Sequence, residues 1–178
     1  YRQLFLVYAI FSTLLLLGIP QSMLYFLPKA GSREKQNVLI SHCLNIISVL
    51  GLVFAICLLF LRGIIANLFH NPALEKLLII YALYPIFLFV TQFFSNVMLG
   101  LKQPLKAATF TIFSITADFI LIVGSALLTR NLTIIVGGVI TSAFLQWLYA
   151  RISLSKFRAK GTYFDLSSFK TIMNYSLP

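Results

Sequence analysis

Acidic residues are scarce in this 178-residue chain, which has four Asp and Glu against fourteen Lys and Arg. Charged residues of both signs make up 10% of the sequence, hydrophobic residues make up 60%, and the mean hydropathy is +0.94. Soluble domains carry about 25% charged residues, so this composition predicts a membrane protein. The basic residues stand singly in short polar connectors and form no continuous basic face, which argues against nucleic acid as a partner.

Cysteine and histidine are also rare, with two of each. Cys43 and Cys57 lie on one predicted helix, and at about 1.5 Å per residue they are roughly 21 Å apart, beyond the reach of a disulfide. Neither His42 nor His70 has a Cys, Asp or Glu at metal-ligand spacing. The sequence therefore predicts no metal site and no bound cofactor.

The acids are scattered singly along the chain, as Glu34, Glu75, Asp118 and Asp165. An enzyme embedded in the membrane would need a cluster of catalytic groups at one membrane face, and the sequence shows none. We therefore do not expect an enzyme. A membrane-embedded glycan-processing enzyme is the least favoured alternative.

Long apolar stretches dominate the amino-acid sequence. A hydrocarbon core about 30 Å thick needs roughly 20 helical residues to cross it. We expect an all-α membrane protein, a polytopic helical bundle whose five spans are residues 4–27, 38–61, 77–99, 107–128 and 132–154. Polar residues 29–37 and amphipathic residues 62–76 would connect spans. Residues 155–171 are interpreted as a cytoplasmic linker and 172–178 as the start of the next helix, so the chain is expected to be a fragment.

The basic residues predict the orientation, because cytoplasmic connectors carry an excess of Lys and Arg. If the connectors alternate across the membrane, one side has four basic residues: Arg2, Arg62, Lys76 and Arg130. The other side has ten: Lys29, Arg33, Lys35, Lys102, Lys106, Arg151, Lys156, Arg158, Lys160 and Lys170. We expect the second side to be cytoplasmic, which places Tyr1 outside.

Asp118 is the only carboxylate inside the five stretches. An acid at membrane depth is costly and normally faces the bundle interior or a water-filled cavity, so it indicates a pathway through the protein. At about 100° per residue, polar residues of this stretch share one helix face: Thr111, Ser114, Asp118, Ser125 and Thr129. Apolar residues point the other way, toward lipid: Ile112, Phe113, Phe119, Ile120 and Val123.

Other predicted spans carry similar polar faces. The second has Ser41, Asn45 and Ser48, the third has Tyr81, Tyr84, Gln92, Ser95 and Asn96, and the fifth has Gly138, Ser142, Gln146 and Tyr149. The candidate substrate pathway consists of Asp118, Gln92, Asn96, Gln146, Asn45, Ser114 and Gln21. The alternatives are that the small polar residues serve close helix packing and that Asp118 forms a structural ion pair with an arginine outside this chain. Pro20 and Pro85 each interrupt the backbone of a predicted span.

Short motifs occur in order along nearly the whole chain. They are Gly18-Ile19-Pro20-Gln21-Ser22, Tyr25-Phe26-Leu27-Pro28, Ile65-Ala66-Asn67-Leu68-Phe69 with Asn71-Pro72, Gly100 with Lys102, and the terminal Ser176-Leu177-Pro178. In order and spacing they resemble the polysaccharide biosynthesis, or O-antigen flippase, family of the multidrug/oligosaccharidyl-lipid/polysaccharide exporter superfamily.

The resemblance implies a carrier of roughly twelve to fourteen helices, built as two lobes around a central cavity. This chain would supply helices two to six of the N-terminal lobe, in a bacterial or archaeal cytoplasmic membrane. The implied cargo is an undecaprenyl-diphosphate-linked oligosaccharide, moved to the periplasmic leaflet for O-antigen, capsule or exopolysaccharide synthesis. Implied partners are membrane lipids, a coupling proton or sodium ion, and the C-terminal lobe.

One requirement of such a cargo is poorly met by the sequence, because a diphosphate needs cations. Arg2, Lys29 and Arg33 lie only at the ends of spans. The nearest alternative is a cation-coupled multidrug antiporter of the same superfamily, in which Asp118 would bind a proton or sodium.

Overall fold

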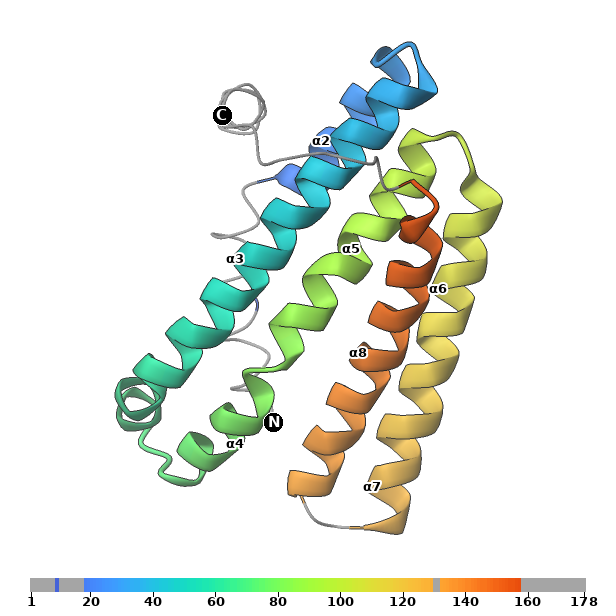
Figure 1. The fold of residues 1–178 in the computed structure, drawn as a ribbon. Coiled ribbons are helices and arrows are strands. Elements are labelled where there is room, and N and C mark those ends of the chain that lie inside the picture. Colours follow the sequence, from blue (N-terminus) through green and yellow to red (C-terminus); the bar gives the residue numbers. More distant parts are fainter. Residues whose placement is uncertain (1–8, 10–17, 130–131, 158–178) are drawn as a thin grey trace.

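The computed structural model describes residue 9 and residues 18–129 and 132–157, and these residues form a bundle of helices (Figure 1). The prediction of an all-α fold is confirmed for them. Most of the expected first span, the linker beyond residue 157 and the expected helix start at 172–178 lie outside the described residues. Two helices, Arg33–Leu68 and Pro104–Leu128, and the segment Thr133–Ser155 are long and apolar enough to cross a membrane.

Helix α2 (Ile19–Lys29) begins after Gly18, whose φ of 69° is a left-handed conformation that glycine adopts without steric cost. Pro20 lies in the first turn of α2, where its missing N–H removes no helical hydrogen bond. Pro20 therefore lies at the start of α2.

Helix α3 (Arg33–Leu68) has 36 residues and extends past the expected span 38–61 at both ends. At its start, the Ser32 side chain accepts a hydrogen bond from the backbone N–H of Lys35 at 3.3 Å, and Glu34 lies in the first turn. Both features stabilise a helix N-terminus, which explains why the polar residues 33–37 are helical and do not form a connector. A helix of this length spans about 54 Å, more than the hydrocarbon core.

The expected third span is broken into two helices. Helix α4 (Ala73–Tyr81) and helix α5 (Tyr84–Gly100) meet at a bend of 47° and together count as a fourth candidate span. Pro85 lies in the first turn of α5, so the break falls just before the proline that cannot donate to the preceding turn. The pair covers the expected span 77–99, begins at Ala73, and is broken next to Pro85, where the sequence predicts an interruption of the backbone.

The fourth expected span is one continuous apolar helix with a change of pitch inside it. It consists of helix α6 (Pro104–Asp118), the π-helical segment η1 (Phe119–Val123) and helix α7 (Gly124–Leu128), and the chain returns through helix α8 (Leu132–Ser155). The side chains expected to face lipid are exposed on the described bundle, among them Ile112 at 66% and Phe119 at 66%.

Helix α5 lies at the centre of the bundle, where it contacts α2, α3, α6 and α8. The core is built from aromatic and aliphatic side chains, and the rings of Phe54 and Phe89 stack with centroids 5.8 Å apart. Gly100 permits the close approach of α2, since a Cβ at this position would lie 2.7 Å from the backbone oxygen of Met23.

Basic residues gather at one end of the described bundle. The α2–α3 connector, the α5–α6 connector and the C-terminal end of α8 lie together at the upper end in Figure 1, while the α3–α4 connector lies at the lower end. The upper end carries Lys29, Arg33, Lys35, Lys102, Lys106, Arg151 and Lys156, against Arg62 and Lys76 at the lower end. This segregation is compatible with the expected cytoplasmic upper end, and the orientation itself stays a prediction.

Candidate functional site

Asp118 lies at the junction of α6 and η1, deep along the apolar hairpin formed by α6, η1, α7 and α8. Facing it on α8 are Ser142 and Gln146, which are four residues apart and therefore share one face of that helix. The segment that follows Asp118 is a π-helix, a rare geometry that often occurs at functional sites.

The three side chains form a closed hydrogen-bonded cluster, which we call the Asp118 cluster. The Ser142 hydroxyl donates to Oδ1 of Asp118 at 2.5 Å, and Nε2 of Gln146 donates to the same oxygen at 2.9 Å. Nε2 of Gln146 also lies 3.1 Å from Oγ of Ser142, which accepts from it. Ser142 is fully buried and Gln146 nearly so, whereas Asp118 is half-buried.

A glycine explains why α8 comes close enough to reach Asp118. A Cβ at Gly138 would lie 2.7 Å from the backbone oxygen of Leu121 in η1 and 2.9 Å from Oγ of Ser125. Only a residue without a side chain allows this approach. Ser142 follows Gly138 by one helical turn, so the same close contact brings Ser142 to the carboxylate of Asp118.

The cluster also bears on the alternative role of Asp118 as one half of a structural ion pair. Both of its hydrogen-bond donors are neutral. The ion pair found in the described part of the chain joins Arg62 of α3 to Glu75 of α4 at 3.3 Å, on an exposed surface. Asp118 is thus held by neutral donors from a neighbouring helix.

Comparison with known proteins gives the family. The sequence pattern described as polysaccharide biosynthesis protein matches residues 1–178. The chain belongs to this polysaccharide biosynthesis family. No curated protein and no solved structure matches it.

Within this polysaccharide biosynthesis family member, the structure brings together two of the predicted pathway residues, Asp118 and Gln146. Ser114 lies one turn before Asp118 on α6, half-buried, and its hydroxyl has no hydrogen-bond partner among the described residues. Asn96 is half-buried and donates to the backbone oxygen of Gln92 at 3.2 Å.

The other predicted pathway residues lie elsewhere. Gln92 of α5, Asn45 of α3 and Gln21 of α2 have exposed side chains on the described bundle. None of the three takes part in the Asp118 cluster. Their place in a shared pathway stays a prediction.

Ser142 belongs to the cluster but was not among the predicted pathway residues. Its signal was present in the sequence, because it lies on the polar face that includes Gly138 and Gln146. A serine alone is weak evidence in a membrane helix, where it commonly serves packing. Its contact with Asp118 makes it distinctive, and this contact joins residues 24 positions apart.

Chemically, the Asp118 cluster is a carboxylate whose charge is supported by two neutral donors inside an apolar helical hairpin. A carboxylate in such a setting normally faces the interior of a helical bundle or a water-filled cavity. No group of three or more potential metal ligands occurs among the described residues.

Proposed function

We propose that this polysaccharide biosynthesis family member is a flippase. Its cargo would be an undecaprenyl-diphosphate-linked oligosaccharide, which it moves from the cytoplasmic to the periplasmic leaflet of a bacterial or archaeal cytoplasmic membrane. The described helices would form helices two to six of the N-terminal lobe of a two-lobe carrier. The observation that carries this proposal is the Asp118 cluster, since a carboxylate held by neutral donors at membrane depth is typical of a transport pathway.

The chemistry of the polar side chains supports a glycan as the cargo. Sugar hydroxyl groups are recognised by amides, hydroxyls and aromatic rings, and the polar positions on these helices are of those kinds. The exposed side chains of Gln92, Asn45 and Gln21 have little reason to face hydrocarbon. We therefore place them toward the cavity between the two lobes.

The bend between α4 and α5 supports alternating access as the mechanism. Discontinuous helices occur in secondary transporters near the substrate site, where the two halves of the carrier move against each other. The 47° break before Pro85 lies in the helix pair that also packs against α8, the helix carrying Ser142 and Gln146. A change in the bend angle between α4 and α5 would be transmitted to the Asp118 cluster through the packing of this pair against α8.

The proposal is tested by deleting the gene in the native host and measuring where the lipid-linked oligosaccharide accumulates. We expect surface glycan to be lost while the intermediate accumulates in the cytoplasmic leaflet, and the full-length protein expressed in trans should reverse both effects. Purified protein in proteoliposomes should then move a fluorescent lipid-linked oligosaccharide between leaflets.

The same experiment separates the flippase from the multidrug antiporter. An antiporter would leave glycan display and the lipid intermediate unchanged, and its loss would raise sensitivity to cationic drugs. That result would overturn the proposal and would reassign Asp118 to a coupling site for drug export.

A further inference from the structure

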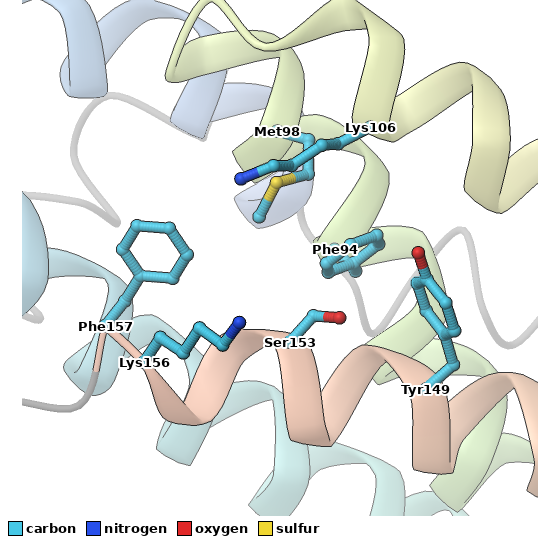
Figure 2. A pocket seen from close by; sticks show the side chains of 7 residues that line it. All are labelled: Phe94, Met98, Lys106, Tyr149, Ser153, Lys156 and Phe157. Carbon is cyan, nitrogen blue, oxygen red and sulfur yellow. The ribbon is translucent and has the colours of Figure 1, made fainter.

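A cavity of about 230 Å³ opens at the basic end of the bundle, between the end of α5, the start of α6 and the end of α8. Figure 2 shows the side chains that line it: Phe94, Met98, Lys106, Tyr149, Ser153, Lys156 and Phe157. The amino groups of Lys106 and Lys156 approach the cavity from opposite sides, one from α6 and one from the turn after α8. This cavity is separate from the Asp118 cluster and shares no residue with it.

The polar lining is positively charged. Two lysines line it together with the hydroxyl-bearing Ser153 and Tyr149. The acids of the described residues, Glu34, Glu75 and Asp118, are not among the lining side chains. Two cations and the Ser153 hydroxyl around one small space form a donor set for a phosphate group, which carries negative charge and accepts several hydrogen bonds.

The apolar part of the cavity favours a phosphate that is attached to a lipid. Phe94, Met98 and Phe157 form its hydrophobic lining. Tyr149 stacks on Phe113 with ring centroids 5.3 Å apart, and Phe113 is exposed on the side of α6 that is expected to face lipid. The aromatic wall therefore continues from the cavity to the outer surface of the bundle. An apolar surface contributes nothing to the binding of a free phosphate, whereas burial of the first carbons of a lipid chain against it stabilises a bound lipid.

The position along the helices agrees with a headgroup site. Lys106 lies in the first turn of α6, and Lys156 follows the last residue of α8, so both are at the ends of helices that can cross a membrane. Basic pockets between such helix ends, at the level of the lipid headgroups, are known binding places for anionic lipids.

We propose that this cavity binds the phosphate group of a lipid headgroup, held by Lys106 and Lys156, with Ser153 as a hydrogen-bond donor. With a membrane phospholipid as the occupant, the site is independent of the proposed transport function, and with a lipid-linked sugar it rests on that function. Two sources share the required chemistry, an anionic membrane phospholipid and the diphosphate of a lipid-linked sugar.

The test measures lipid binding to the purified full-length protein in neutral detergent by native mass spectrometry. The probes are a short-chain phosphatidylglycerol, a short-chain polyprenyl diphosphate and inorganic phosphate. In Lys106→Gln/Lys156→Gln we expect lipid affinity to fall about 25-fold, from roughly fivefold for each lysine. Lys106→Arg/Lys156→Arg keeps both charges and should retain binding.

Two matched controls distinguish binding in this cavity from attraction to the basic surface in general. Lys35→Gln/Lys102→Gln removes the same charge at the same end of the bundle from lysines that do not line the cavity. Ser153→Leu fills the cavity without a change in charge, and Ser155→Leu places the same side chain on the exposed face of the same helix. Only the glutamine pair in the cavity and Ser153→Leu should lose the lipid.

Loss restricted to phosphatidylglycerol identifies a membrane phospholipid as the occupant, and loss restricted to the polyprenyl diphosphate identifies a polyprenyl-diphosphate lipid. Equal loss in both lysine pairs, normal binding by Ser153→Leu, or binding of inorganic phosphate as tightly as either lipid would overturn the proposal.

Discussion

The side-chain nitrogen of Gln146 lies 2.9 Å from a carboxylate oxygen of Asp118, although the two residues are 28 positions apart in the sequence. This contact joins α8 to the junction of α6 and η1 at the depth where both helices are apolar. It makes Asp118 part of a defined polar cluster.

Asp118→Asn should reduce surface-glycan display while the protein remains in the membrane. Asparagine keeps an oxygen that can accept from Ser142 and Gln146, so the packing of α6 on α8 should persist while the negative charge is lost. We expect glycan display to fall about tenfold, which corresponds to about 1.4 kcal/mol in the transport step. The measurement is glycan display normalised to the amount of membrane protein.

Ser125→Ala is the matched control, because the Ser125 hydroxyl makes a local bond to the backbone oxygen of Ile122 at 2.9 Å. It should change glycan display little. Normal display by Asp118→Asn at wild-type protein level would remove Asp118 from the mechanism. Disappearance of the protein itself would favour a structural role.

Gln146→Leu should destabilise the bundle by about 1–3 kcal/mol, because it removes a buried donor and leaves the carboxylate of Asp118 with one partner in place of two. Unfolding in a mixed-detergent titration measures the loss. In a background that already carries Asp118→Leu, the same change should cost less, since the acceptor is gone. Equal costs in the two backgrounds would show that the contact contributes nothing to stability.

Gly138→Ala should separate α8 from η1 and cost about 1–3 kcal/mol of stability, because the new methyl group would meet a backbone oxygen that cannot move aside. Gly137→Ala is a close control, with no atom within 4 Å of the added Cβ. It should be neutral or stabilising by up to about 1 kcal/mol, since alanine favours a helix more than glycine does. Thermal unfolding of the two variants side by side measures the difference. Equal stability would contradict the proposed close contact.

The orientation can be tested by cysteine labelling in a background that lacks Cys43 and Cys57. Lys35→Cys and Ser155→Cys lie at the basic end of the bundle, and Lys76→Cys lies at the opposite end. An impermeant reagent added to intact cells should label only Lys76→Cys, because the basic end is expected to face the cytoplasm. Labelling of Ser155→Cys from outside would reverse the predicted topology.

Some differences between expectation and structure have a local cause that hydropathy does not report. The ends of α3 were assigned to connectors because residues 33–37 and 62–68 include charged side chains, yet Ser32 caps the helix and α3 continues to Leu68. By contrast, the break between α4 and α5 falls next to Pro85, where the sequence predicts an interruption, because proline has no N–H to donate.

The amino-acid sequence by itself determined the helical class, the membrane environment and the isolation of Asp118 among apolar residues, because composition and helical periodicity are local properties. Only the tertiary structure decided which polar residues meet Asp118. Gln146 and Ser142 reach it, while Gln92 stays exposed, because the crossing of α8 over η1 is set by close packing at Gly138. Likewise, Lys106 and Lys156 are 50 residues apart and become neighbours around one cavity only when α6 and α8 pack side by side.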